Sequence, residues 1–157
     1  MKHLKQFILT FLCCCSILFI TSCGAKKVDY KEVGLSADKE TLVEAIGSEP
    51  NEEKKEEDGS TTYHYKKSQY LDYVGTMEYH EYNDVMLYSR WTYTNKKDEK
   101  ITDAYTAICN NMKKEYGKGR ENKKNNSTTY DMDDKSIVVA YSIEDPDKQV
   151  CITTMMK

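Results

Sequence analysis

The chain has 157 residues, with 23 Lys and Arg against 26 Asp and Glu, and a formal net charge of −3. This length suits one domain with a single hydrophobic core. Nucleic-acid binding depends on clustered Lys and Arg, so the mildly acidic balance argues against nucleic acid as a partner.

The N-terminus has the form of an export signal. Lys2 and Lys5 precede an apolar run, Phe7–Ile20, which Thr21-Ser22-Cys23 follows. A bilayer-spanning helix needs roughly 20 apolar residues, and this run is shorter, which argues against a transmembrane anchor. A signal peptide that is cleaved at another position is the remaining alternative.

The sequence Ile20-Thr21-Ser22-Cys23 resembles the lipobox of bacterial lipoproteins. The resemblance implies that residues 1–22 are a removed signal peptide and that Cys23 is thioether-linked to diacylglycerol. Residues 23–35 would then form a lipidated N-terminus and short tether, and the lipid would hold the protein on the extracytoplasmic face of the cell membrane. Processing would leave 21 basic and 26 acidic residues, a net charge of −5.

Two helices are predicted from capping and periodicity. Residues 36–46 can begin with Ser36 as N-cap and end at Gly47, which suits the left-handed position after a helix. Asp98–Tyr116 carries apolar residues at helical spacing and ends before Gly117. Its apolar stripe consists of Ile101, Tyr105, Ile108 and Met112.

A β-hairpin is predicted from Leu71–Tyr82 and Val85–Tyr93, joined at Asn83-Asp84. We expect one face of this hairpin to lie against the helices, with Trp91 in the core beside Val74. The residues expected on that face are Val74, Tyr82, Val85, Leu87, Trp91 and Tyr93, and those on the other are Met77, Tyr79, Met86 and Tyr88. Residues 137–143 and 150–154 are predicted as two further strands.

The sequence Ser60-Thr61-Thr62-Tyr63 recurs as Ser127-Thr128-Thr129-Tyr130, each time after a predicted helix. Two units, residues 36–95 and 96–157, are therefore predicted within one domain of residues 36–157. The expected fold class is α+β: helix–strand–strand–strand twice, with an antiparallel sheet and helices packed on one face. Asn51–Gly59 and Arg120–Asn126 are expected to be loops.

This element order resembles the tandem α-β units of β-lactamase inhibitor protein and of the small SmpA/OmlA-type lipoproteins. The residues that carry the resemblance are Gly47-Ser48-Glu49-Pro50, after the first helix, and the strand Tyr63-His64-Tyr65. It implies a fold that presents a protein-binding surface and has no chemistry of its own. No functional residue is carried over from either family.

Catalytic and metal-binding residues are not predicted, and no cofactor is expected. His64 and His80, with Glu78 or Glu81, could form a zinc site in principle. Neighbouring strand residues point to opposite faces, however, so His80 and Glu81 cannot converge on one ion. Both histidines are interpreted as polar residues on half-exposed strands.

Tyrosines crowd the first unit, which fits half-exposed strands in general. Tyr79 and Tyr88 are the exception: we expect them to be cross-strand neighbours on the face away from the helices, forming a possible binding patch.

Cys109 and Cys151 could form a disulfide in an extracytoplasmic chain. Val150 and Ile152 would point Cys151 away from the helix, which favours free thiols.

These observations predict a membrane-anchored, non-enzymatic module that binds an unidentified protein or peptide partner. The alternatives are a structural or envelope-assembly lipoprotein that regulates a neighbouring membrane complex, and an enzyme. A deep pocket with convergent polar groups would favour an enzyme, whereas an exposed aromatic sheet face would favour binding.

Overall fold

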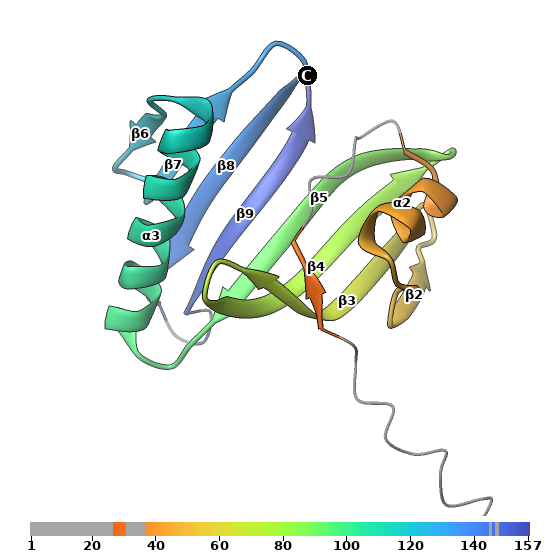
Figure 1. Cartoon of the computed structure of the whole chain (residues 1–157), viewed down its shortest axis with the longest axis horizontal. Coiled ribbons are helices and arrows are strands. Elements are labelled where there is room, and N and C mark those ends of the chain that lie inside the picture. Colours follow the sequence, from red (N-terminus) through yellow and green to blue (C-terminus); the bar gives the residue numbers. More distant parts are fainter. Residues whose placement is uncertain (1–26, 31–36, 145, 147) are drawn as a thin grey trace, which may run out of the picture.

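The computed structural model describes residues 27–30, 37–144, 146 and 148–157, which form one nine-stranded sheet and two helices (Figure 1). The expectations for residues 1–26, for the cap Ser36 and for most of the tether lie outside the described residues. The elements are β1 (Val28–Asp29), α2 (Lys39–Ile46), β2 (Glu52–Lys55), β3 (Thr61–Tyr70), β4 (Tyr73–Tyr82), β5 (Val85–Thr94), α3 (Asp98–Tyr116), β6 (Arg120–Asn122), β7 (Ser127–Asp131), β8 (Lys135–Ser142) and β9 (Gln149–Met156).

The strand order is β1-β3-β4-β5-β9-β8-β7-β6. Strand β2 pairs with residues 61–64 of β3, whereas β1 pairs with residues 68–69 of the same strand. Strands β1 and β3 run parallel, whereas the other pairs are antiparallel. The last strand, β9, lies between β5 and β8, with Ile152 opposite Trp91 on one side and Val139 on the other. The C-terminal strand therefore joins the two halves into one sheet.

The expected fold class is wrong. The described residues are 49% strand and 22% helix, so the protein is a mixed sheet with two helices and not two tandem helix–strand–strand–strand units. Two segments expected to be loops contain short strands, β2 and β6, in which every residue is exposed. Their charged sequences, Glu-Glu-Lys-Lys and Arg-Glu-Asn, show no apolar alternation because they pair only through their backbones at the sheet edges.

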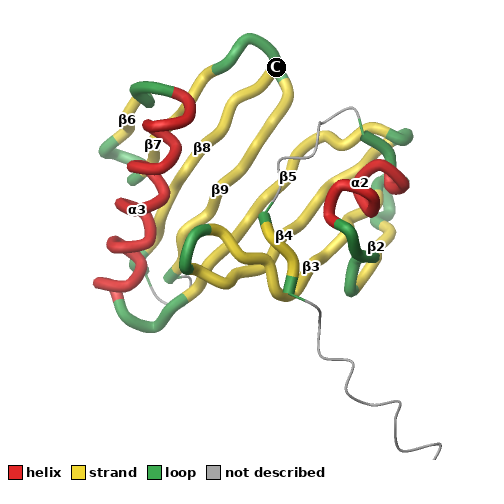
Figure 2. The backbone as a smooth tube through the Cα atoms, in the orientation of Figure 1, coloured by secondary structure: helices red, strands yellow, loops and turns green. Residues whose placement is uncertain are grey.

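The helices do not form a continuous layer on the sheet. Helix α3 lies along β7, β8 and β9, while α2 lies apart from it near β2 and β3 (Figures 1 and 2). Helix α3 has the predicted bounds and buries Ile101, Ala104, Ile108 and Met112. Helix α2 starts later than predicted, since Asp38 is its N-cap and accepts the Thr41 N–H at 2.8 Å. Gly47 ends it with φ of 71°.

The hairpin turn is confirmed, but the faces assigned to its strands are wrong. Asn83 and Asp84 have φ of 53° and 59°, the left-handed pair of a type I′ turn. The register shifts where His80 pairs with Tyr88 and Glu81 pairs with Met86, which leaves Leu87 as an extra residue. A one-residue bulge reverses the side-chain alternation on the two sides of it. Val85 and Leu87 are consequently exposed although Trp91 is buried.

Trp91 lies in the core, as predicted. It has no exposed surface, and its indole Nε1–H donates to the Ser68 carbonyl oxygen at 3.0 Å. Its strand neighbours are Met77 and Ile152, whereas Val74, expected beside it, is 47% exposed. Burial of the aromatic ring removes a large apolar surface from water, which stabilises the fold. Because the one N–H donor of the ring is hydrogen-bonded, no polar group of Trp91 is left without a partner.

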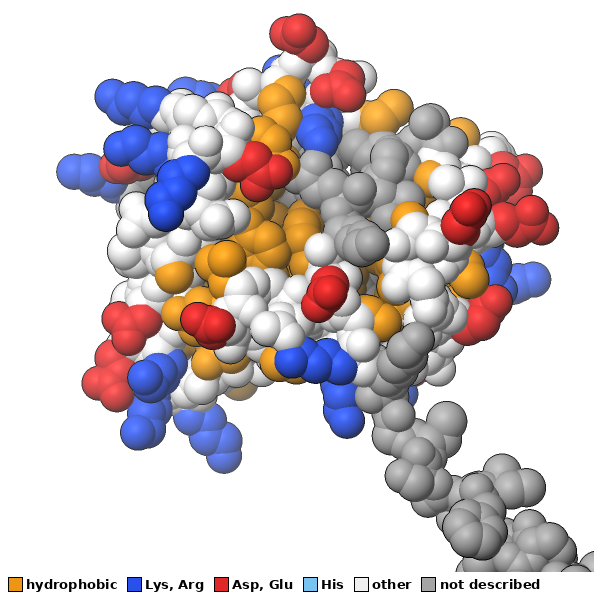
Figure 3. Space-filling view, in the orientation of Figure 1, with side chains coloured by type: hydrophobic (Ala, Val, Ile, Leu, Met, Phe, Trp, Pro, Cys, Tyr) orange, Lys and Arg blue, Asp and Glu red, His pale blue; other side chains and the backbone are white. Residues whose placement is uncertain are grey.

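Tyrosines fill the space between the two helices. The ring of Tyr70 lies 5.9 Å from that of Trp91 and 5.0 Å from that of Tyr30, while Trp91 stacks 6.4 Å from Tyr93. Tyr73 continues the series at 5.1 Å from Tyr93. In the space-filling view, hydrophobic side chains gather in the middle of this face (Figure 3). Packed aromatic rings thus cover the middle of the sheet, where helices were expected.

Replacement of Gly75 by Ala tests this packing. A Cβ atom at residue 75 would lie 2.1 Å from the Thr92 carbonyl oxygen and 3.0 Å from Trp91 Cε2. Because the first neighbour is backbone, we expect Gly75→Ala to lower the free energy of unfolding by about 1–3 kcal/mol, measured by urea denaturation followed by Trp91 fluorescence. Thr76, the exposed neighbour of Gly75, provides the control, since Thr76→Ala should change the free energy of unfolding by less than about 0.5 kcal/mol. Equal stability of the two variants would contradict the close approach.

Candidate binding face

The face of the sheet opposite the helices and Trp91 is here called the open face. Side chains alternate along each strand, so the partners of the buried residues point to this side. No helix of the described residues covers it (Figure 1). Its central residues are Thr62 and His64 of β3, Glu78 and His80 of β4, Tyr88, Arg90 and Thr92 of β5, Cys151 and Thr153 of β9, and Val138 and Ala140 of β8.

An ordered row of polar and aromatic side chains crosses β3, β4 and β5. The Thr62 hydroxyl lies 3.1 Å from His80 Nδ1, and the His80 and Tyr88 rings stack at 4.9 Å with an interplanar angle of 12°. The Arg90 guanidinium carbon lies 5.7 Å from the Tyr88 ring centroid, within cation–π range. Each contact restricts the next side chain, so Tyr88 and Arg90 are held in place before any partner binds.

A second row, beside the first, carries opposite charges. His64 Nδ1 lies 3.5 Å from Glu78 Oε1, and Glu78 pairs across the strands with Arg90. Beyond Arg90 the row continues through Thr153, Val138 and Thr129, which carry no charge. Along this row the charged side chains are therefore Glu78 of β4 and Arg90 of β5, whereas the positions on β9, β8 and β7 are neutral.

The sheet edges are unsuited to strand addition. All residues of β2 are exposed, and Lys54 pairs with Glu56 at 2.8 Å. At the other edge, Arg120 of β6 contacts Asp131 at 3.3 Å, and β6 has only three residues. Short, charged edges hinder pairing with another chain. A partner is thus expected to contact the side chains of the face and not the backbone of an edge.

The predicted patch of Tyr79 and Tyr88 does not exist. Tyr79 pairs with Ser89 and Tyr88 pairs with His80, so the two rings lie on opposite faces of the sheet. Tyr79 is 1% exposed and packs edge-on against Tyr65 at 6.0 Å, and burial raises its pKa. The error follows from the bulge at Leu87. Tyr88 does belong to the open face, where its neighbours are His80 and Arg90.

Sequence reasoning missed this cluster because it interpreted His80 as a polar residue on a half-exposed strand and did not consider Arg90. The sequence signal for part of this cluster is the spacing Tyr88-Ser89-Arg90, which places the side chains of Tyr88 and Arg90 on the same face of a strand. His64 and His80 also share this face, but within the described ranges no group of three His, Cys, Asp or Glu side chains could hold a metal ion.

Cys109 and Cys151, the two cysteines in the described part of the chain, are free and lie on different sides of the sheet. Cys151 is on the open face, 3.6 Å from the Thr92 hydroxyl, between the buried Val150 and Ile152. Cys109 lines a cleft of about 310 Å³ between α3 and the β6–β7 hairpin, and its carbonyl accepts the Tyr130 hydroxyl at 2.9 Å. Burial raises the pKa of both thiols, so both are protonated at neutral pH and neither is an activated nucleophile.

No family model, curated protein or solved structure matches this chain. No helix in the described part of the chain is long and apolar enough to cross a membrane.

The thiol state gives a direct test of the cysteine geometry. In the protein denatured without reductant, Cys109 and Cys151 should both be titratable thiols, because they are not bonded to each other. The native protein should react much more slowly, since burial disfavours both thiolates. Ellman titration measures both quantities, and Cys109→Ser and Cys151→Ser should each remove one thiol. Absence of thiols from the denatured protein would contradict this geometry.

Proposed function

We propose that this protein is a lipid-anchored, extracytoplasmic binding module that recognises a protein or peptide partner through its open face. The observation that carries the proposal is the ordered row of His80, Tyr88 and Arg90 on a sheet face that no described helix covers. Tyr and Arg are the residue types, with Trp, that contribute most to binding energy at protein interfaces.

The dimensions of the open face suit a protein partner. The nine strands together contain 60 residues, and each residue covers about 3.3 Å × 4.8 Å, or roughly 16 Å², of a sheet face. The whole face therefore measures roughly 950 Å², comparable to the roughly 800 Å² that each partner contributes to a standard interface. A small molecule would leave most of this area in contact with water.

The side chains of the open face also suit binding without large entropic cost. Tyr88 is fixed between His80 and Arg90, so little rotamer freedom remains to be lost when a partner contacts it. The neutral side chains of Thr153, Val138 and Ala140 can be covered without removing a charge from water. Neither cysteine thiol supplies a nucleophile for an enzymatic alternative.

The anchoring part of the proposal depends on Ile20-Thr21-Ser22-Cys23. Lipid on Cys23 would keep the domain beside the membrane, where two or more acyl chains hold a protein firmly. A partner at the same membrane would then be met at a high effective concentration.

Site-specific crosslinking tests the open face. A photoreactive amino acid at position 153, in the middle of the open face, should crosslink a defined membrane or envelope protein in intact cells. Tyr88→Ala should weaken the crosslink, and once the partner is purified it should lower the affinity about tenfold or more, as loss of a central aromatic does.

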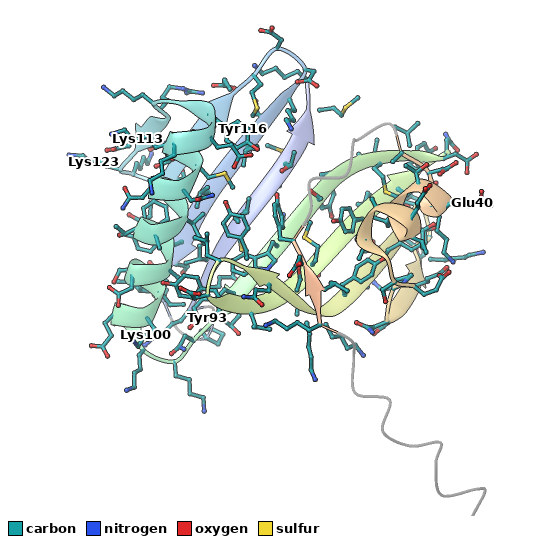
Figure 4. The ribbon with its side chains drawn as sticks, viewed as in Figure 1. Glu40, Tyr93, Lys100, Lys113, Tyr116 and Lys123 are labelled. Atoms are coloured by element: carbon teal, nitrogen blue, oxygen red, sulfur yellow. The ribbon has the colours of Figure 1, made fainter. Side chains whose placement is uncertain are left out.

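The matched control for this experiment is on the helix side. The same photoreactive amino acid at Lys100, which is exposed on α3 and labelled in Figure 4, should give no crosslink to that protein. Equal crosslinking from both positions, or a crosslink insensitive to Tyr88→Ala, would contradict binding through the open face.

Replacement of Cys23 tests the anchor separately. Cys23→Ala should abolish incorporation of a clickable fatty acid and leave a precursor that retains residues 1–22. Fatty-acid labelling and mass spectrometry of the N-terminus measure the two effects, and Cys109→Ser serves as the control that should still be labelled. A labelled Cys23→Ala protein would overturn the assignment of the lipidation site.

A further inference from the structure

We propose that a cavity on the helix side, independent of the open face, binds a quaternary ammonium group. The cavity has a volume of about 230 Å³ and lies among β1, the end of β3 and the last turns of α3. The described residues that line it are Tyr30, Tyr70, Met112, Glu115 and Tyr116. We call this site the tyrosine cage.

Two of the tyrosines form a corner of the cage. The Tyr30 and Tyr70 rings are 5.0 Å apart at an interplanar angle of 80°. Asn111 Nδ2 donates to the Tyr70 hydroxyl at 3.0 Å, which fixes that ring to α3. Met112, 1% exposed, closes the base. Ring faces carry negative electrostatic potential, so perpendicular rings attract a cation from two directions.

Tyr116 and Glu115 complete the cage from the C-terminal end of α3. Figure 4 shows Tyr116 on the side of α3 that faces the sheet, whereas Lys113 lies on the outer side. The Tyr116 hydroxyl donates to Glu115 Oε1 at 2.9 Å, which holds the carboxylate beside the ring. The Lys135 ammonium nitrogen lies 6.0 Å from the Tyr116 ring centroid, so the chain's own cation already contacts one face of this ring and a ligand would contact the other face.

The hydrogen bonds of the cage favour a methylated cation over a primary ammonium. A primary ammonium has three N–H groups to satisfy and is strongly hydrated. In the cage, Asn111 occupies one acceptor position of the Tyr70 hydroxyl, and the Tyr116 hydroxyl occupies one acceptor position of Glu115 Oε1, so fewer acceptors remain for these three N–H groups. A quaternary ammonium has no N–H and needs only ring faces and a negative charge. Among the described lining residues, Glu115 is the charged one, so it provides charge neutralisation.

Choline provides the test ligand, and Trp91 provides the signal. Trp91 is the chain's one tryptophan, and its ring lies 5.9 Å from that of Tyr70. We expect choline to change the Trp91 fluorescence of the full chain in maltoside micelles in a saturable manner at constant ionic strength. The uncharged isostere 3,3-dimethylbutan-1-ol should give no saturable change. An equal response to the two compounds, or no saturable response to choline, would overturn the proposal.

Variants of the exposed rim test which residues bind. Glu115→Gln and Tyr116→Leu should each raise the apparent Kd for choline about tenfold, because they remove a charge and a ring face. Tyr116→Phe keeps the ring and should keep most of the affinity. The matched control is Glu99→Gln, an exposed carboxylate at the other end of the same helix, which should bind like the unmodified chain. Unchanged affinity in both rim variants would also overturn the proposal.

The same chemistry can come from free choline or from a lipid headgroup, and a second titration distinguishes these sources. Vesicles of phosphatidylcholine should reproduce the Trp91 response, and its sensitivity to Glu115→Gln, if the headgroup can enter while it is attached to lipid. A response to free choline without a response to these vesicles assigns the site to soluble quaternary ammonium compounds. Circular dichroism of each variant verifies that the fold is retained.

Discussion

The close approach of Trp91 to the backbones of β3 and β4 is the constraint on which the rest of the structure depends. The indole donates to the Ser68 carbonyl at a bulge in β3, where Tyr65 pairs with Met77 and Ser68 pairs with Gly75. Gly75 permits the ring to lie against β4, since any Cβ there would meet Trp91 and Thr92. A buried indole N–H without an acceptor would cost about 1–3 kcal/mol, so the bulge and the ring position stabilise each other.

This constraint also orients both faces of the sheet. Trp91 points to the core, so Arg90 and Thr92 on either side of it point to the open face. The extra residue Leu87 shifts the side-chain alternation of β5 by one position. Met86 and Trp91 are therefore buried on the same face although they are five residues apart. Ile152, opposite Trp91 on β9, carries the same alternation into the C-terminal half. The tyrosine cage and the open face thus arise from one register.

Sequence patterns predicted the features that depend on local chemistry. The bounds of α3, the left-handed Gly47 and the Asn83-Asp84 turn follow from amphipathic spacing and from the backbone preferences of single residues. Trp91 is correctly predicted to share a buried face with Tyr93 because both lie on the same side of the bulge, and the direction of Cys151 follows from unbroken alternation along β9. Residues 137–142 and 149–156 form strands with the predicted apolar face for the same reason.

The features that could not be predicted depend on distant backbone pairing. The bulges at β3 and β5 exist because Ser68 and Tyr88 must match partners on neighbouring strands, and no single residue in them signals a bulge. Edge strands β2 and β6 are polar throughout, and the parallel contact of β1 with β3 joins residues about 40 positions apart in the sequence. The binding row and the tyrosine cage both assemble across such contacts. For this reason, the residue types that favour binding were visible in the sequence, but their grouping into one open face and one cage was not.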